Sequence, residues 1–363
     1  MNILLFVNTP AQVHEFKYVA RTLQTRGHKV MILARHYECT LDLLDAYGLR
    51  YEVYGRAKRR GYGRVLELIP YVRKAHRLAR KFKPDVIVGT GIIEAYTSIL
   101  FRKPCIVFTD TETASLEFIL YKPFVKAIYT PACFRKDLGR KHVRYNGFKE
   151  LAYLHPDRFQ PDVSIYNLLG IENGQPYVIL RLNPLDAFHD IGIRGFSSQD
   201  KLRLVQALEP YARVLISSEA ALEPGLERYA ISIPAHRIHD AEYYAQLLVT
   251  DAGTMLTEAA VLGTAGVYCS GFVAKKCYGN FVELEEKYRL ISSYSDPNQA
   301  ITKAVELIKQ PDLKQQWQEK SRAVIADKID VLKFMVETIE SYAPTTLPRT
   351  QDSQRSKPQR PSG

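Results

Sequence analysis

The chain has 363 residues, of which 46% are apolar and 25% charged, enough to build two hydrophobic cores. Its five cysteines form no C-x-x-C pair, which excludes a disulfide-stapled scaffold and a zinc ribbon and favours a reducing compartment. The longest uncharged run, residues 259–274, contains glycines and hydroxyl side chains and is too short to cross a bilayer. The N-terminus lacks the basic region of a signal peptide, so we expect a cytoplasmic protein.

Positive charge is concentrated in the first part of the sequence. The net charge is +11, but residues 1–150 contain 27 Lys and Arg against 13 Asp and Glu, whereas residues 151–363 contain 23 against 26. Between residues 56 and 83, eleven basic side chains accompany a single acid, Glu67. This distribution predicts one positive patch on the first half of the protein.

Short β-branched runs alternate with helix-period segments along the first half. The predicted strands cover residues 2–7, 29–33, 50–53, 85–88, 104–107 and 125–129. Between the first two strands, apolar residues from Val13 to Leu23 recur at helical spacing, and Gly27 ends the helix. The alternation is typical of a mostly parallel sheet covered by helices on both faces.

The turn from the first strand into the first helix is a candidate ligand site. Backbone N–H groups at a helix N-terminus favour anions, and Asn8 and Thr9 are polar residues that let a ligand approach. The turn has no G-x-G-x-x-G, and no P-loop occurs in the chain, so neither nucleotide motif is present. His14 would lie in the first helical turn, where an imidazole can take a proton near neutral pH, or it would only pack against the helix start.

Residues 65–82 are predicted to form an amphipathic helix, which Pro70 kinks or restarts. Its apolar stripe consists of Val65, Leu68, Val72, Ala75, Ala79 and Phe82, and most of its Lys and Arg residues lie off that stripe. The basic face of residues 56–83 suits a membrane surface with anionic lipids. Nucleic acid is the competing partner for such charge, but no nucleic-acid-binding motif is present, so we predict none.

A second polar segment follows the strand at residues 104–107. Asp110 and Glu112 lie among threonines where the strand ends, a position suited to binding sugar hydroxyls or moving protons. The same residues could instead cap the following helix. The pair also resembles a divalent-metal motif, but we rank metal binding lower and predict no metal.

The alternation of strands and helices begins again in the second half, with strands at residues 177–181, 213–216, 247–250 and 264–268 and apolar helical stripes between 296 and 342. Residues 344–363 are rich in Pro, Ser, Gln and Arg, which predicts disorder. We therefore predict an N-terminal domain at 1–157, a C-terminal domain at 158–343 and a disordered tail. Two such domains leave a cleft between the carboxyl ends of their sheets.

The third and most specific segment follows the predicted strand at residues 247–250. Gly253 and Thr254 open a helix whose N-terminal N–H groups can hold a diphosphate, and Glu258 lies one turn further along, placed to accept hydrogen bonds from a ribose. An ordinary helix start with Asp251 as its cap is the alternative. Arg181, at the end of another strand, could also contact the diphosphate, or it could be a surface residue.

These segments carry a resemblance to known families. The strand–Gly–Thr–helix segment ending in Glu258-Ala259-Ala260-x-x-Gly263 resembles the nucleotide-sugar site of GT-B glycosyltransferases and of non-hydrolysing UDP-N-acetylglucosamine 2-epimerases. More narrowly, four segments resemble a prokaryotic GT-B-like family known mainly as a domain of unknown function. They are Asn8-Thr9-Pro10-x-x-Val13-His14, Asp110-Thr111-Glu112, residues 144–156 and Ala252-Gly253-Thr254-Met255.

The resemblance implies a GT-B-like fold of two Rossmann-like, doubly wound domains facing a central cleft. Gly253 and Thr254 match the phosphate-binding helix start of these enzymes, and Glu258 matches their ribose-binding acid. His14 falls where membrane-associated GT-B transferases present a histidine in their first loop, and Glu112 falls near a catalytic Glu of the epimerases. The Arg that the epimerases carry in their first loop is missing here, which counts against epimerisation.

The sequence therefore predicts a metal-independent glycosyltransferase that uses a nucleotide sugar, favoured to be a UDP-sugar, as donor substrate and needs no cofactor. The acceptor would be anionic or lipid-linked, in glycan or cell-envelope synthesis, with contact to the inner face of the membrane. His14 or Glu112 would deprotonate the acceptor hydroxyl. The alternatives are a 2-epimerase in which Asp110 and Glu112 move protons, and a non-catalytic protein that binds sugar nucleotides.

Overall fold

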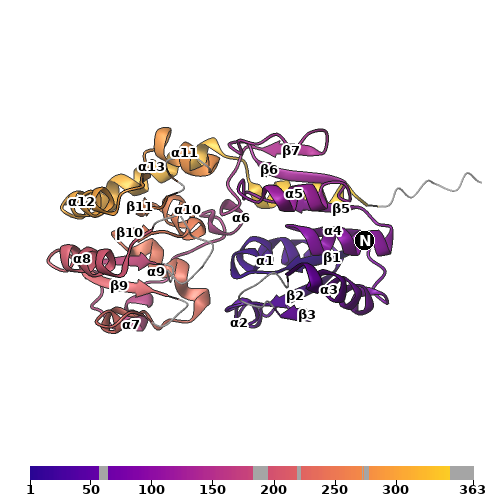
Figure 1. The fold of residues 1–363 in the computed structure, drawn as a ribbon, viewed down its shortest axis with the longest axis horizontal. Coiled ribbons are helices and arrows are strands. Elements are labelled where there is room, and N and C mark those ends of the chain that lie inside the picture. The colour runs from indigo at the N-terminus through magenta and orange to yellow at the C-terminus, as the bar shows by residue number, and fades with distance from the viewer. Residues whose placement is uncertain (57–63, 183–194, 219–221, 272, 274–277, 344–363) are drawn as a thin grey trace, which may run out of the picture.

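A computed structural model describes residues 1–56, 64–182, 195–218, 222–271, 273 and 278–343, with the backbone alone for residues 64–67. Part of the predicted basic patch (Lys58, Arg59 and Arg60) and the tail at 344–363 lie outside the described residues. The described chain forms two α/β domains, each built on a parallel sheet (Figure 1). The predicted GT-B-like, two-domain fold is confirmed.

The first domain contains a seven-stranded sheet with the order β3-β2-β1-β4-β5-β6-β7. Its strands are β1 (Asn2–Val7), β2 (Lys29–His36), β3 (Tyr51–Arg56), β4 (Val86–Gly89), β5 (Cys105–Phe108), β6 (Ala127–Pro131) and β7 (His142–Tyr145). Its helices are α1 (Pro10–Thr25), α2 (Thr40–Ala46), α3 (Arg64–Ala79), α4 (Ile92–Phe101) and α5 (Ser115–Tyr121). All strand pairs are parallel, and the order reverses next to β1, which places a cleft at the carboxyl ends of β1 and β4.

The second domain contains a five-stranded parallel sheet with the order β12-β11-β10-β8-β9. Its strands are β8 (Tyr177–Arg181), β9 (Arg213–Ser217), β10 (Leu247–Thr250), β11 (Ala265–Cys269) and β12 (Ile291–Tyr294). The helices from the linker onward are α6 (Leu151–Leu154), α7 (Ile165–Leu169), α8 (Ser198–Leu208), α9 (Ile238–Tyr244), α10 (Gly253–Val261), α11 (Gly279–Glu286), α12 (Pro297–Ile308), α13 (Leu313–Asp327) and α14 (Val331–Glu340). Short 3₁₀ turns occupy Glu227–Tyr229 and Ala235–Arg237.

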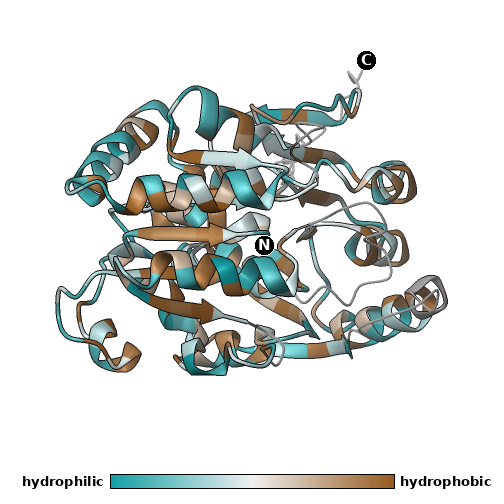
Figure 2. Cartoon of the chain, turned by 60° about the vertical axis from the view of Figure 1, so that its left-hand side comes forward, coloured by the Kyte–Doolittle hydropathy of each residue, from teal (hydrophilic) through white to brown (hydrophobic). Residues whose placement is uncertain are grey.

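Apolar strands form the interior of both domains, and the helices turn an apolar face toward them (Figure 2). Ile3 and Leu5 of β1 pack into one core cluster and Leu4 and Phe6 into another, because successive side chains of a strand point to opposite faces of the sheet. Both clusters are buried, as expected for a parallel sheet with helices on both faces. The first helix starts with Pro10 at its first position, and Gly27 follows its end with φ +84°.

Helix α3 has the amphipathic character that the sequence predicted. Val72, Ala75 and Ala79 are buried on the first domain, whereas the described basic residues Arg73, Lys74, Arg77, Arg80 and Lys81 of this segment are exposed. Pro70 lies inside the helix, which continues past it. No helix among the described residues is long and apolar enough to span a lipid bilayer.

The last helix corrects the predicted domain organisation. Helix α14 was expected among the closing helices of the second domain, but it packs on α1 and α6, and in Figure 1 the yellow end of the chain lies with the first domain. Glu340 bonds Arg26 at 2.7 Å and His28 at 2.9 Å, and the Phe334 ring stacks on Tyr145. The apolar stripe of α14 was visible in the sequence, but not the domain that it would cover.

The chain crosses between the domains twice, and the two crossing segments are bonded to each other. The Asn146 side chain donates to the Asp327 carbonyl oxygen at 2.8 Å, and the Ile329 N–H donates to the Asn146 carbonyl oxygen at 2.9 Å. Arg158 forms an ion pair with Asp330 close by. Both connections therefore run side by side at one edge of the interface.

Candidate functional site

A cavity of about 300 Å³ lies between the domains at the carboxyl ends of β1, β4 and β5. Its walls come from α1, from the loops after β4 and β5 and from α5 in the first domain, together with Lys149 of the linker and Thr254 of the second domain. The polar residues that line it are Thr9, Gln12, Glu15, Thr90, Thr109, Asp110, Thr111, Glu117, Tyr121, Lys149 and Thr254. The N-terminus of α10 thus opens onto the same space as the switch point of the first sheet.

The floor of the cavity is a connected set of hydrogen bonds. The Asn8 N–H donates to Gln12 Oε1 at 2.6 Å, and Gln12 Nε2 donates to Thr90 Oγ1 at 2.6 Å. Beneath them, Glu94 Oε1 accepts the N–H groups of Thr90 and Gly91 at 2.5 and 2.7 Å. These bonds hold the ends of β1 and β4 in one arrangement, which makes the floor preorganised for a ligand.

Three ionisable side chains meet at the cavity wall. Lys149 Nζ lies 2.7 Å from Asp110 Oδ2, and both side chains are largely buried. Glu15, on α1, is 4% exposed, and burial raises its pKa to about 8 against the opposing effect of the Lys149 charge. The group therefore combines an ion-paired carboxylate with a carboxyl that exchanges its proton near neutral pH, which suits acid–base chemistry.

Glu15 and Lys149 were missed as functional residues by the sequence analysis. Glu15 follows Ala11 by four residues and Gln12 by three, so the three side chains share the face of α1 that lines the cavity. This spacing was readable in the sequence, whereas nothing there indicated that the linker residue Lys149 would reach Asp110. Lys149 does lie within the segment 144–156 that carried the family resemblance.

His14 does not face the cavity, which corrects the expectation that it would lie at the cleft mouth. It is 5% exposed, bonds the Tyr47 hydroxyl through Nδ1 at 3.2 Å and packs against the rings of Tyr153 and His239. Burial, with added repulsion from His239 and Lys17, holds the pKa of His14 well below its ordinary value. The alternative, a histidine packed near the start of the helix, is the one that the structure supports.

Glu112 joins the two domains instead of lining the cavity. Its Oε1 accepts the N–H groups of Arg135 at 3.1 Å and of Gly279, in the other domain, at 2.8 Å. A side chain at Gly279 would bring a Cβ within 1.8 Å of the Cys133 carbonyl oxygen, so this approach of α11 requires glycine. The expected catalytic role of Glu112 has no support in this geometry, because two amides hold the carboxylate in the interface.

The first-turn residues Asn8 and Thr9 have different positions. Thr9 lines the cavity and precedes α1, and its carbonyl oxygen accepts the N–H groups of Gln12 and Val13. Asn8 does not line it, and its Oδ1 accepts the Tyr54 hydroxyl at 2.5 Å. Only Thr9 of this pair is therefore placed to touch a molecule in the cavity.

The start of α10 presents an open helix N-terminus. Gly253 is its first residue, Ala252 precedes it without a side-chain cap, and Thr254 lines the cavity. Arg181 ends β8, directly beside Thr250 in the sheet, and donates to Ser217 Oγ at 3.3 Å. Uncapped N–H groups at a helix start attract anions, and here they lie beside an arginine.

Glu258 is enclosed by other side chains. This differs from the expectation that its carboxylate would be open to a ribose. It is 3% exposed and accepts hydrogen bonds from the Tyr153 hydroxyl at 2.7 Å and from His239 Nε2 at 3.0 Å. Burial alone would raise the pKa of Glu258, but His239 and Tyr153 outweigh it and hold the pKa below its ordinary value. In this structure the Tyr153 hydroxyl and His239 Nε2 occupy the carboxylate oxygen Oε1 that a ribose would otherwise bind.

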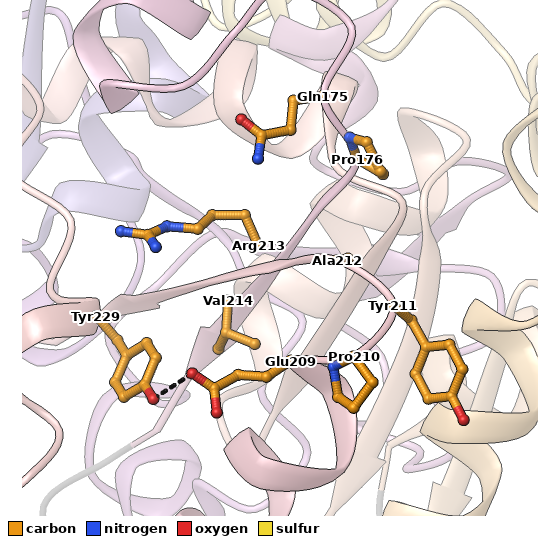
Figure 3. Close-up of a pocket in the computed structure, with 9 residues that line it drawn as sticks. All are labelled: Gln175, Pro176, Glu209, Pro210, Tyr211, Ala212, Arg213, Val214 and Tyr229. Carbon is orange, nitrogen blue, oxygen red and sulfur yellow. Dashed lines mark hydrogen bonds between the residues drawn. The ribbon is translucent and has the colours of Figure 1, made fainter.

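A second cavity, of about 360 Å³, lies at the amino ends of β8 and β9 in the second sheet (Figure 3). It is lined by Pro176 and Arg213, which flank the amino ends of β8 and β9, and by Tyr229, whose hydroxyl donates to Glu209 at 2.5 Å. In parallel α/β sheets, ligands bind at the carboxyl ends of the strands. This cavity is therefore not part of the candidate site.

The fold and the cleft place the protein among GT-B-like proteins, the class that contains GT-B glycosyltransferases and UDP-N-acetylglucosamine 2-epimerases. The chain belongs to the family described as "Protein of unknown function (DUF354)", which it matches over residues 1–343. No curated protein sequence matches it significantly.

Three solved structures illustrate the likeness. MnaA of S. aureus, solved with UDP, has a TM-score of 0.65 at 10% identity, covering 94% of this chain and 96% of that chain. The UDP-GlcNAc 2-epimerase of Neisseria meningitidis, bound to UDP-GlcNAc, has a TM-score of 0.61 at 12% identity, covering 94% and 100%. Spinosyn forosaminyltransferase SpnP has a TM-score of 0.64 at 11% identity, covering 95% and 100%. At such low identity the likeness establishes the fold alone.

Proposed function

We propose that this protein binds a nucleoside-diphosphate sugar, favoured to be a UDP-sugar, between its domains and transfers the sugar to an anionic or lipid-linked acceptor. The observation that carries the proposal is the shared cavity. The N-terminus of α10 reaches it from the second domain through Thr254, and the pair Asp110–Lys149 with Glu15 reaches it from the first.

The donor would be held by the second domain. The N–H groups of the first turn of α10 and the Thr254 hydroxyl would suit phosphate oxygens, and the positive end of the helix would offset the charge that develops on the leaving diphosphate. Arg181, one strand away, would supply a further cation. Solved structures with the same fold hold UDP, UDP-GlcNAc and thymidine diphosphate, which supports this class of donor.

We assign the acid–base role to side chains that line the cavity, and not to His14 or Glu112 as the sequence suggested. The Asp110 carboxylate, paired with Lys149, or the Glu15 carboxylate would take the proton of the acceptor hydroxyl as its oxygen bonds to the anomeric carbon. The bond from that carbon to the diphosphate oxygen breaks, and the electron pair leaves with the diphosphate. No metal is needed for this step, because the helix N-terminus carries the charge.

The acceptor side would face a membrane. Helix α3 presents exposed Arg73, Lys74 and Arg77, and the adjoining helices α4 and α5 expose several apolar side chains. These are Ile99, Leu100, Leu116 and Ile119, and together with Phe124, which follows α5, they are between 42% and 70% exposed. Basic residues beside exposed apolar ones suit the surface of an anionic bilayer, so we infer peripheral binding at its inner face.

A UDP-sugar 2-epimerase is the second candidate. The observation in its favour is Glu15, because a carboxyl whose pKa is raised to about 8 by burial could supply the acid or base that an epimerase needs at a sugar carbon. The transferase remains the leading candidate because the basic and apolar outer face of the first domain has no use in an enzyme that acts on a soluble sugar nucleotide alone.

The test compares UDP-sugars with and without acceptor. A transferase stays nearly silent with the donor alone and releases UDP when an extract of anionic, lipid-linked glycans in vesicles is added. An epimerase yields the C2-inverted sugar without acceptor.

A binding experiment tests the donor site. UDP should raise the melting temperature, and Thr254→Val should weaken UDP binding about 5- to 10-fold. Arg213→Ala, at the second cavity, should leave UDP binding unchanged. Failure of every nucleoside diphosphate to shift the melting temperature would remove the proposed donor site.

A further inference from the structure

Three buried side chains outside the cavity are arranged like ligands of a metal ion. His239 and Glu242 lie three residues apart on α9 and so share one face, and Glu258 reaches them from α10, which packs against α9. One ligand atom from each lies within 4.8 Å of the other two. Their exposed fractions are 2%, 0% and 3%.

Glu242 is the unusual member of this cluster. Neither of its carboxylate oxygens has a hydrogen-bond partner among the described residues, although the side chain is wholly buried. By contrast, Glu258 accepts two hydrogen bonds. A buried carboxylate without a partner, beside a second carboxylate, is costly unless a cation or a proton compensates it.

The nearby cations do not supply that compensation directly. The charge of Arg181 acts on Glu242 and that of Lys17 on Glu258, yet no hydrogen bond from either reaches Glu242. The rings of His14 and His239 pack edge to face at 4.4 Å, and this contact fixes the orientation of the imidazole. The space between the three side chains is therefore enclosed, and among the described residues no donor is hydrogen-bonded to Glu242.

We propose that His239, Glu242 and Glu258 bind one divalent cation of the Zn²⁺ or Mn²⁺ type. One imidazole nitrogen with two carboxylates suits these ions, whereas Mg²⁺ prefers oxygen ligands alone. The Tyr153 hydroxyl, which donates to Glu258 at 2.7 Å, would orient that carboxylate from outside the ligand set. The inference stands on these residues alone and does not rest on the proposed glycosyl transfer.

The cation would have a structural role and would not take part in the chemistry of the sugar. It would join α9 to α10, and through Glu258 it would connect both helices to Tyr153 at the domain linker. Because α10 carries Thr254 into the cavity one turn before Glu258, the ion would fix the helix that presents the anion site. This site differs from the Asp110–Glu112 pair that the sequence analysis considered for a metal.

The test measures metal on the full chain, purified without a polyhistidine tag. After equilibration with Zn²⁺ or Mn²⁺ and dialysis, elemental analysis should find about one equivalent in the wild type, and Co²⁺ should give visible absorption bands typical of low coordination number. Glu242→Gln, which keeps the shape of the side chain, should lose at least 90% of the bound metal. Glu112→Gln, at another buried carboxylate with an unpartnered oxygen, should retain it.

Two outcomes would overturn the proposal. Less than a tenth of an equivalent in the wild type, with no shift in melting temperature on adding Zn²⁺ or Mn²⁺, would mean that the carboxylate pair holds a proton instead. Equal metal in the wild type and Glu242→Gln would place any bound ion elsewhere. If Glu242→Gln fails to fold, His239→Gln provides the same comparison, and the wild-type Co²⁺ spectrum is still informative.

Discussion

Two groups of buried ionisable residues lie between the domains, and they differ in what surrounds them. Glu15, Asp110 and Lys149 open onto a cavity, whereas His14 and Glu258 are enclosed by rings of Tyr153 and His239. Each group contains one residue of α1, and these two residues, His14 and Glu15, are adjacent in the sequence. A single step along an α-helix turns the side chain by about 100°, so His14 points into the aromatic packing while Glu15 faces the cavity. Neighbouring residues with similar chemistry thus belong to different sites.

The largest expected effect is that of Asp110→Asn. The substitution removes the carboxylate that contacts the buried Lys149 ammonium at 2.7 Å, which should lower the free energy of unfolding by about 3 kcal/mol and abolish most turnover. Chemical denaturation, with Lys149→Met and the double variant completing a cycle, measures the coupling between the two side chains. Additive effects in that cycle would show that the ion pair does not organise the cavity.

Glu15→Gln should change how stability depends on pH. Because the folded pKa of Glu15 is raised to about 8, the unfolded chain releases this proton first, and the wild type loses stability as pH rises from about 4.5 to 8. The Gln variant has no proton to lose. Its advantage over the wild type should therefore grow with pH across this window, to about 4 kcal/mol at pH 8, and then level off.

Melting curves from pH 5 to pH 9 test this dependence. Glu117→Gln is the matched control, since Glu117 is an exposed carboxylate at the rim of the same cavity and should show no such trend. Parallel pH profiles for the wild type and Glu15→Gln would mean that Glu15 is not buried in solution, and the contrast between the two groups would be lost.

Tyr153→Phe should have the smallest effect. It removes one of the two donors to Glu258 while keeping the ring that encloses it, which should cost about 1–2 kcal/mol of unfolding free energy. The pH dependence that Glu15 causes should remain unchanged. A large change in that dependence, seen in the same melting curves, would show that the enclosed group and the cavity group are energetically one network.

Much of the fold was predictable because apolar runs mark buried parallel strands. The bounds predicted for β1, β8 and β10 agree with the structure. Strands β7 and β12 were missed because they are short edge strands rich in polar residues, such as Arg144 and Ser292. Edge strands need only one neighbour and bury little, so their hydrophobic signal is weak.

The position of a site residue was predictable where the residue directly follows a strand. It was less predictable where contacts with the other domain determine whether the side chain is open or enclosed. Thr9, Asp110 and Thr254 line the cavity, and each lies at a strand end or helix start that the sequence marks. Glu258 is enclosed by Tyr153, 105 residues away in the chain. No local spacing encodes that contact, because it depends on how the linker helix α6 packs between the domains.

The paired connections at Asn146 and Ile329 restrict how the two halves of the molecule can move. Since both the outgoing and the returning segment pass through one hydrogen-bonded edge, the second domain is attached by two tethers and not by one. We therefore expect any relative motion of the domains to be a rotation about an axis near that edge, which would displace the opposite rim most. A cut in either tether alone would leave the halves associated, and cutting both would be needed to free the second domain.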